Sequence, residues 1–317
     1  MRDMIELSMC SGQLELDCLS EIIRCLPNLA ILVVSVTAKP FNLITFPASL
    51  LRDLVKSTGT NLQAIVWQDN FHFKPPRDWC ITLAECSKLK TIACAIPFEG
   101  TLNLNFPLLK TLYVWGWRLI GPSDSELPSL RHLIINVSPI PGGLRLCLLE
   151  NHGAKLDIIQ LKIGSYYIVL PSWLDSISVH CPNLSRLDLS FDAWPDVNCF
   201  GARLNLPESL QILGIQSLKK QSPSSEYNHL LQGLQNMKFG KAHEAIQFTD
   251  MGNFLDLRRH PRILRDFLDM IKGIGLAARG PDGSLLFSGR PNNGIVRGPQ
   301  NLESVLERRH VSKCNVV

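Results

Sequence analysis

The sequence lacks the long apolar runs of a membrane protein. Its longest strongly apolar stretch, LAILVVSV at residues 29–36, has the length of a strand, whereas a helix that crosses a bilayer needs about 20 apolar residues. The first residues, MRDMIELSMC, contain no apolar segment of a secretory signal peptide. We therefore expect an intracellular protein, in the cytoplasm or the nucleus, without a membrane partner.

Charge is scarce as well. Charged residues make up 19% of the 317-residue chain, and the net charge is +4. A nucleic-acid-binding protein needs a concentrated basic face, whereas the basic runs here, RRHPR at 258–262 and ERRH at 307–310, are short. We interpret them as solvated surface, so nucleic acid is not an expected partner.

The ten cysteines include no pair with C-x-x-C spacing. Cys25, Cys86 and Cys181 stand in apolar surroundings in the sequence. In an intracellular protein such thiols are expected to be reduced and buried, where they act as small hydrophobic side chains.

Catalytic motifs are present only in incomplete form. HEAIQ at 243–247 begins like the zinc motif H-E-x-x-H but ends in glutamine, and the segment is typical of a strand. GIGLAA at 273–278 fits a loose dinucleotide fingerprint but follows a predicted helix instead of a strand, so we interpret it as a helix stop before a final strand. We predict no catalytic residue, cofactor or metal, and a protein that is not an enzyme.

The chain does contain a repeat. CPNLSRLDLSFD at 181–192 recurs as the pattern L-x-x-L-x-L, for example in LPNLAILVVSVT at 26–37 and LPSLRHLIINVS at 127–138. The first leucines of eight such units, called the anchor leucines here, are Leu29, Leu62, Leu89, Leu109, Leu130, Leu156, Leu184 and Leu210, at spacings of 33, 27, 20, 21, 26, 28 and 26 residues. All but the first spacing fall in the range of about 20–29 residues of a leucine-rich repeat. The His180–Cys181 pair, with Asp188 and Asp192 close behind, therefore belongs to a repeat, and it lacks the spacing of zinc ligands.

This repeat predicts the fold. The L-x-L part is expected to form a short strand with alternate residues on opposite sides, one side stacking in the core and the other facing outward. Helices are predicted between strands at 16–26, 47–57, 171–180, 224–237 and 260–273. The predicted fold class is α/β, a leucine-rich-repeat solenoid (horseshoe) over residues 1–287, with parallel strands on its concave face and helices on its convex face. The tail at 288–317, rich in Gly, Pro and Asn, is expected to be disordered.

The repeat units resemble the leucine-rich-repeat region of fungal F-box proteins. The segment FLDLRRHPRILRDFLDMIKGIGLAARGPDGSLL at 254–286 looks like the closing unit of such proteins. The resemblance implies a scaffold that recognises a substrate of a cullin-type ubiquitin ligase. An F-box would recruit a Skp-type adaptor, but the 317 residues contain no stretch of that kind, and MIELSM at 4–9 already resembles a strand. The adaptor is therefore an expected partner only if an F-box lies upstream.

The outward residues of neighbouring strands would form one surface, because such strands lie about 4.8 Å apart. Trp, Tyr and Arg are the residue types most enriched at the energetic centres of interfaces. We predict that a protein partner or ligase substrate binds the concave face through Tyr113, Trp115, Trp117, His132, Ile134, Asn136, Gln160, Lys162, Arg186 and Asp188. Tyr113 and Trp115 are expected to be exposed, whereas Trp117 fits exposure and packing under a loop equally well.

Two alternatives stay open. A repeat-only scaffold or regulator without a ligase link would present the same surface. A parallel β-helix enzyme acting on carbohydrate would also repeat, but its rungs return by strand or loop, whereas amphipathic helices are predicted here.

Overall fold

The computed structural model describes residues 3–9, 18, 21–22, 24–36, 44–45, 48–69, 73–74, 79–97, 105–115, 126–137, 147–164, 169–194, 204–219 and 221–288. The chain divides into two compact units, residues 1–156 and residues 157–317, which are called unit 1 and unit 2. The predicted disorder of the tail concerns residues that, apart from Ser288, lie outside the described part of the chain.

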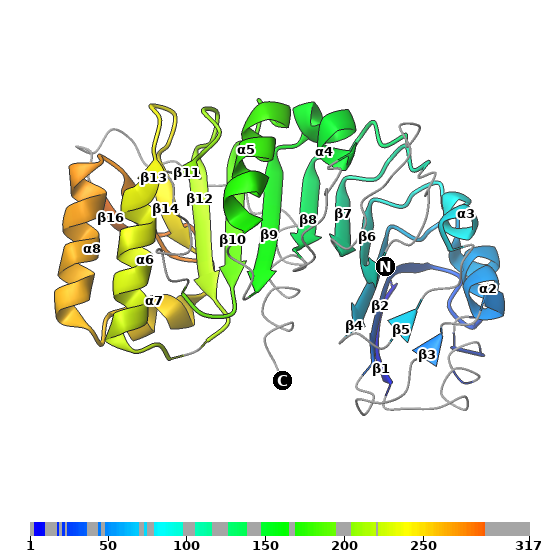
Figure 1. Cartoon of the computed structure of the whole chain (residues 1–317). Helices are drawn as coiled ribbons and strands as arrows, with labels where there is room; N and C mark the ends of the chain where they lie inside the picture. The colour runs from blue at the N-terminus through cyan, green and yellow to red at the C-terminus, as the bar shows by residue number, and fades with distance from the viewer. Residues whose placement is uncertain are drawn as a thin grey trace. The chain divides into compact units, whose positions relative to one another are not determined.

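Unit 1 is built on a parallel sheet (Figure 1). Its strands follow one another in the order β1 (Asp3–Met9), β2 (Leu29–Val36), β4 (Ala64–Asp69), β6 (Thr91–Pro97), β7 (Thr111–Trp115) and β8 (His132–Asn136), each parallel to the next. The other elements are α2 (Ala48–Thr58), α3 (Trp79–Ala84), α4 (Cys147–His152), the 3₁₀ turn η1 (Gly153–Lys155), and the short pair β3 (Ile44–Thr45) and β5 (Phe73–Lys74). After β1, each strand of this sheet comes from a different predicted repeat.

Unit 2 repeats this plan and closes it with a hairpin. Its strands are β9 (Ile158–Gly164), β10 (Arg186–Phe191), β12 (Ile212–Ser217), β14 (Ala245–Phe248) and β15 (Ala277–Arg279), all parallel, followed by β16 (Leu285–Ser288), which is antiparallel to β15. The helices are α5 (Leu170–His180), α6 (Ser224–Asn236), α7 (Met251–Leu257) and α8 (Pro261–Gly273), and β11 (Leu204–Asn205) pairs with β13 (Met237–Lys238). Both units thus have a mostly parallel sheet with helices between the strands, which confirms the α/β class.

The leucines of the repeat form the core. All eight anchor leucines are at most 2% exposed. The second leucine position of the motif keeps one register across the strands and is also buried: Leu32, Ile65, Ile92, Leu112 and Leu133 pair in unit 1, and Ile159, Leu187, Leu213, Ile246 and Ala278 pair in unit 2. Burying one such aliphatic side chain contributes about 1.5–3 kcal/mol, so the repeat spacing itself encodes the main stabilising contacts.

A backbone turn recurs before each strand. The anchor N–H donates to the carbonyl three residues earlier in seven of the eight units, as in Leu109 to Phe106 at 3.1 Å and Leu184 to Cys181 at 3.2 Å. Leu62 is the exception, because it donates to Thr58, four residues earlier, at the end of α2. The repeats therefore share backbone geometry as well as the sequence motif.

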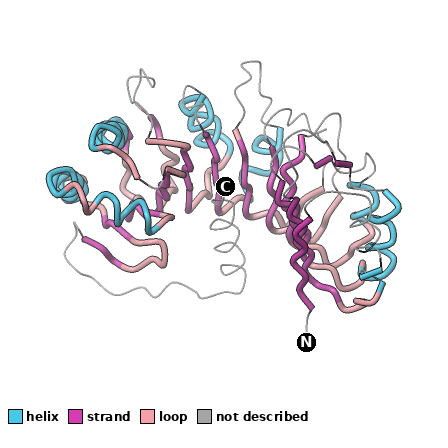
Figure 2. The backbone as a smooth tube through the Cα atoms, turned by 90° about the horizontal axis from the view of Figure 1, so that it is seen from below, coloured by secondary structure: helices cyan, strands magenta, loops and turns pink. Residues whose placement is uncertain are grey.

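The long helices match the predictions closely. Predicted segments 47–57, 171–180, 224–237 and 260–273 correspond to α2, α5, α6 and α8. Pro261 stands in the first turn of α8, and Gly275, just beyond its end, has φ +72°, the left-handed conformation that favours glycine. Figure 2 shows α5, α6 and α8 on one side of the strands of unit 2, and α2 and α3 on one side of the strands of unit 1. No helix in the described part of the chain is both long and apolar enough to cross a membrane.

The cysteine prediction holds for two residues and is wrong for one. Cys86 and Cys181 are buried, and burial raises the pKa of each thiol to about 12. Cys25 is exposed instead. The reason is its register: Cys86 and Cys181 stand three residues before their anchor leucines, at the inward position of the turn, whereas Cys25 stands four residues before Leu29.

Candidate functional site

The residue after the second leucine position lies on the sheet face opposite the core, because side chains alternate along a strand. These residues pair in register from strand to strand and are called the sheet-face row. The row comprises Val33, Val66, Ala93, Tyr113 and Ile134 in unit 1, and Gln160, Asp188, Gly214, Gln247 and Arg279 in unit 2. The same repeat position thus carries apolar side chains in unit 1 and mostly polar ones in unit 2.

In unit 1 the sheet-face row packs as a small second core. Val33, Val66, Ala93 and Tyr113 form one buried cluster, and Ile31 and Ile134 pack against it. Tyr113 is only 9% exposed, since its in-register neighbours, Ala93 and Ile134, are both apolar. The row therefore stabilises unit 1 through apolar contacts on the outer face of its sheet.

This packing overturns the predicted exposure of Tyr113. His132, expected on the same outward surface, is also buried, at 4% exposure, and pairs in register with Thr111 of β7. Ile134 and Asn136 are half-buried. Trp115 ends β7, but its side chain lies outside the described part of the structure, as does the whole of Trp117.

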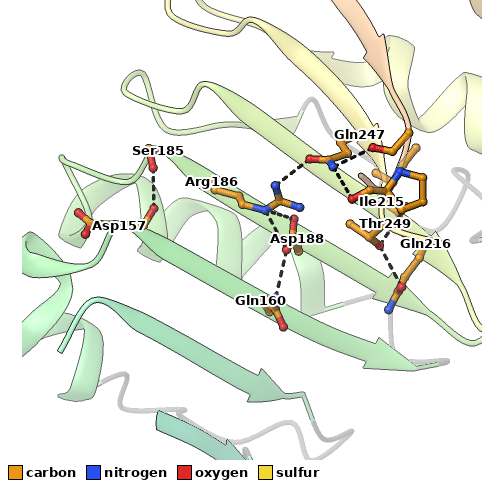
Figure 3. A network of polar contacts seen from close by, with 11 residues as sticks. Asp157, Gln160, Ser185, Arg186, Asp188, Ile215, Gln216, Gln247 and Thr249 are labelled. Atoms are coloured by element: carbon orange, nitrogen blue, oxygen red, sulfur yellow. Dashed lines mark hydrogen bonds and ion pairs between the residues drawn. The ribbon is translucent and has the colours of Figure 1, made fainter. Parts of the chain in front are cut away.

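In unit 2 the sheet-face row belongs to a hydrogen-bonded network, drawn in Figure 3. The Arg186 Nε–H donates to both carboxylate oxygens of Asp188, at 2.9 and 3.1 Å, and the Gln160 amide donates to Asp188 Oδ2 at 3.2 Å. Arg186 Nη1 donates to Gln247 Oε1 at 2.7 Å. Three of the predicted partner-binding residues, Gln160, Arg186 and Asp188, are therefore joined in space.

Gln247 extends the network to the end of the sheet. Its amide donates to the carbonyls of Gly280 and Pro281, at 2.8 and 3.2 Å, in the turn before β16. The network thus runs from β9 through β10 and β14 to the final hairpin. Hydrogen bonds that include a charged group contribute about 1.5–3 kcal/mol each, so this network of hydrogen bonds holds the Arg186 side chain firmly in one place.

Gly214 makes room for the Asp188 carboxylate, which holds Arg186. It lies on β12, between Asp188 of β10 and Gln247 of β14 in the sheet-face row. A Cβ at this position would stand 1.9 Å from Asp188 Oδ1 and 2.9 Å from Thr249 Cγ2. Only a glycine leaves the space that the Asp188 carboxylate occupies over β12.

A second set of polar contacts lies next to the first, one step further along the strands. Gln216 donates to Ser190 Oγ at 2.9 Å, and Thr249 Oγ1 donates to Gln216 Oε1 at 2.9 Å. Lys162, another predicted partner-binding residue, pairs in register with Ser190 and is half-buried. The outward face of unit 2 is therefore polar over two rows, across β9, β10, β12 and β14.

Arg186 keeps binding capacity in this arrangement. Its side chain is 25% exposed and that of Asp188 is 12% exposed. The hydrogen bonds of Arg186 within the described residues use Nε and Nη1, whereas a guanidinium has five N–H donors. Further N–H groups of a fixed, partly exposed cation are thus able to bind an acceptor from another molecule.

Two members of this site, Gln247 and Gly214, carry no direct signal in the sequence. Gln247 lies 61 residues from Arg186, and Gly214 occupies a motif position whose residue type differs from repeat to repeat. Aligning all units on the anchor leucine and comparing the sheet-face row would have found both, because HEAIQF at 243–248 fits the motif with His243 in the anchor position.

His243 is a core residue and not half of a zinc motif. It is 1% exposed, its N–H donates to Gly240 O as in the leucine anchors, and the Gly240 N–H donates to its Nδ1 at 2.6 Å. Burial lowers its pKa below the ordinary value, and the backbone contact with Gly240 opposes this only in part. The predicted strand is confirmed as β14. Among the described residues, no three His, Cys, Asp or Glu side chains gather in a way that could hold a metal ion.

Comparisons with known proteins do not assign the chain to a family. No family model matches the sequence, and no curated protein matches it. A crystal structure of a protein from Bacteroides fragilis is similar over 75% of this chain and 74% of that chain, with 14% sequence identity and a TM-score of 0.44. A TM-score of this size supports no inference about fold or function.

Proposed function

We propose that the chain is a leucine-rich-repeat solenoid that recognises a protein partner through the outward sheet face of unit 2. The repeat architecture is supported by the buried anchor leucines, by the constant register of the second leucine position and by the turn that recurs before the strands. A parallel sheet with one strand per repeat and helical returns is the arrangement that such repeats form.

The observation that supports recognition best is the fixed position of Arg186. An arginine usually loses side-chain entropy when it binds, at a cost of about 0.5–1.5 kcal/mol. Here Asp188 and Gln247 already hold the guanidinium in the free protein, so most of that cost has been met before a partner arrives. Arginines in such positions often contribute 2 kcal/mol or more to an interface.

A purely structural role would explain the network less well. Two short polar side chains in register could link neighbouring strands by hydrogen bonds equally well. Such a link would not need a glycine on β12. The network instead places the Asp188 carboxylate, with Arg186 paired to it, above Gly214 on the face opposite the core. The half-buried Ile158, Gln160 and Lys162 on β9 provide an adjoining surface of mixed polarity.

The resemblance to F-box repeat regions extends this proposal to a ligase. The partner would then be a substrate, and a Skp-type adaptor would bind an F-box elsewhere in the natural protein. Co-precipitation of the adaptor with the protein expressed from its native transcript tests this extension. If the adaptor does not co-precipitate, the proposed function is reduced to that of a recognition scaffold with no ligase link.

Site-specific photo-crosslinking in native cells tests recognition itself. Benzoylphenylalanine at Ile158, next to Arg186 in the sheet, is expected to crosslink to a discrete partner protein. The matched control carries the same group at Asp269, an exposed residue of α8, and is expected not to capture that protein. Equal capture at both positions, or no capture at Ile158, would contradict the proposal.

A further inference from the structure

A second arginine stands near the end of the sheet-face row. Arg279 on β15 pairs in register with Gln247 on β14, and Arg186 Nη1 donates to Gln247 Oε1 at 2.7 Å. The Arg186 guanidinium thus extends from β10 as far as the Gln247 side chain (Figure 3), and neighbouring strands lie about 4.8 Å apart. Two arginines therefore flank Gln247, one from each side of β14, on the sheet face that the proposed function uses.

Arg279 has hydrogen-bond donors that the described part of the chain does not use. Its side chain is only 28% exposed, and its ion pair with Glu244 joins Nη2 and Oε2 at 3.8 Å. This distance is longer than the about 2.7–3.2 Å of an N–H···O hydrogen bond, so none of the five guanidinium N–H groups donates to an acceptor among the described residues. Because polar groups that are largely removed from water are normally hydrogen-bonded, these donors point to an acceptor from another molecule.

The charge of the surrounding groups indicates what kind of acceptor fits. Arg186 is paired with Asp188, and Arg279 lies close to Glu244, so these four side chains together carry no net charge. The cost of removing an ion from water rises with the square of its charge, whereas its attraction to an arginine rises only in proportion to the charge. A singly charged carboxylate is therefore favoured over a doubly charged phosphate.

Apolar side chains lie beside both arginines. Leu285 on β16 pairs in register with Arg279, so the two side chains share one face of the sheet, and Leu285 is 55% exposed. Ile158 and Ile212 pair in register with Arg186 on its two sides and are half-buried. A ligand that reaches the guanidinium groups thus also meets apolar surface.

We propose that an acidic side chain of the partner, Asp or Glu, binds between Arg186 and Arg279, and that a large apolar residue beside it packs on Leu285. This inference rests on the proposed function, because it assigns the chemistry of the partner at the same sheet face. A guanidinium binds a carboxylate through parallel N–H donors. An extended peptide spans about 3.3–3.6 Å per residue, so the apolar residue stands one or two positions from the acidic one.

Peptide selection tests this assignment. Random peptides of about a dozen residues, displayed on phage, are selected on the immobilised full chain, and the affinity of an enriched peptide is measured by fluorescence anisotropy. We expect an Asp or Glu within two positions of a large apolar residue. Arg279→Gln should weaken binding at least about tenfold, a loss typical of a charged hydrogen bond. Replacing the acidic residue of the peptide by its amide should cost as much, and both changes together should cost little more than either alone.

Two further variants serve as controls. Arg265→Gln removes the same charge at an exposed position of α8 and is expected to bind within about twofold of the wild type. Arg279→Lys keeps the charge but loses the planar set of donors, and it should bind between the wild type and Arg279→Gln. Because lysine retains the charge and most of the side-chain length, this variant also guards against an effect of misfolding.

Enriched peptides without an acidic residue would overturn the inference, as would acidic peptides that bind Arg279→Gln as tightly as the wild type. Absence of any enriched peptide would overturn it too. None of these results decides the proposed function, which crosslinking at Ile158 tests separately. Capture of a partner there would leave the sheet face of unit 2 as the recognition surface, with a partner of different chemistry.

Discussion

The two units place opposite chemistry at one repeat position. In unit 1 the sheet-face row holds Val33, Val66 and Tyr113, which pack together and exclude water. In unit 2 the same row holds Asp188 and Gln247, which hold Arg186 through hydrogen bonds. The backbone register is the same in both, so the difference comes from the side chains alone.

This contrast shows which repeat positions specify the fold and which are left to vary. The leucine positions are buried in both units and specify the fold. The sheet-face row is not needed for that core, so it is free either to add apolar packing, as in unit 1, or to present polar groups, as in unit 2. A sheet-face residue must therefore be judged by its neighbours on adjacent strands and not by its own type.

Tyr113 gives the largest expected effect. Tyr113→Ala should lower the free energy of unfolding by about 3 kcal/mol, because it removes a buried aromatic ring and leaves a cavity. Urea denaturation measures this. Tyr113→Leu, which keeps apolar volume, should cost less than about 1.5 kcal/mol. A cost below about 0.5 kcal/mol for Tyr113→Ala would instead be typical of an exposed side chain and would remove the contrast between the units.

Gly214→Ala should have the next largest effect, a destabilisation of about 2 kcal/mol from the clash with Asp188. The direction is informative, because replacing a glycine by alanine without strain stabilises a protein by about 0.4–1 kcal/mol. In an Asp188→Ala background part of the cost should disappear, giving a coupling energy of about 1 kcal/mol in a double-mutant cycle. Strictly additive effects would mean that Gly214 does not make room for the network.

His243 gives the smallest effect and a dependence on pH. Its folded-state pKa is lowered, so the unfolded chain takes up a proton first as the pH falls below about 6.5, the ordinary histidine pKa. The stability present above that pH is therefore lost as the pH falls towards the folded-state pKa. His243→Leu restores the residue found at the other anchors and should stabilise the protein by about 1 kcal/mol at neutral pH, and by more at pH 5.5.

Urea midpoints at pH 7.5 and 5.5 measure this difference. His243→Gln, which keeps a polar side chain but does not titrate, is the control, and it should flatten the pH dependence without the gain in stability. An unchanged pH dependence in both variants would show that another group is responsible.

The sequence was sufficient for the parts of the fold that depend on spacing. The anchor leucines, the strands and helices α2, α5, α6 and α8 follow from local periodicity, which each segment carries within itself. Tyr113 could not be placed correctly in this way, because its burial depends on Ala93 and Ile134, each about 20 residues away along the chain. His243 was missed as an anchor since a histidine breaks the leucine pattern.

The candidate site was also predicted only in part, because some of its residues follow from local periodicity and others do not. Gln160, Arg186 and Asp188 were found because alternation within a strand fixes which residues face outward. Gln247 and Gly214 depend on the order and register of three different strands. Only an alignment of all repeats, or the structure, brings these residues together.

A paired measurement on two variants tests the central contrast most directly. Tyr113→Ala and Arg186→Ala are each measured for the free energy of unfolding and for crosslinking of the partner at Ile158. We expect Tyr113→Ala to lose stability and to keep the crosslinked partner. We expect Arg186→Ala to lose most of the crosslinked partner, at a cost in stability of about 1.5–3 kcal/mol, because its charged hydrogen bonds to Asp188 and Gln247 are lost. Unchanged capture by Arg186→Ala, with only its stability lowered, would contradict the account, because the unit 2 network would then stabilise the sheet and not recognise a partner.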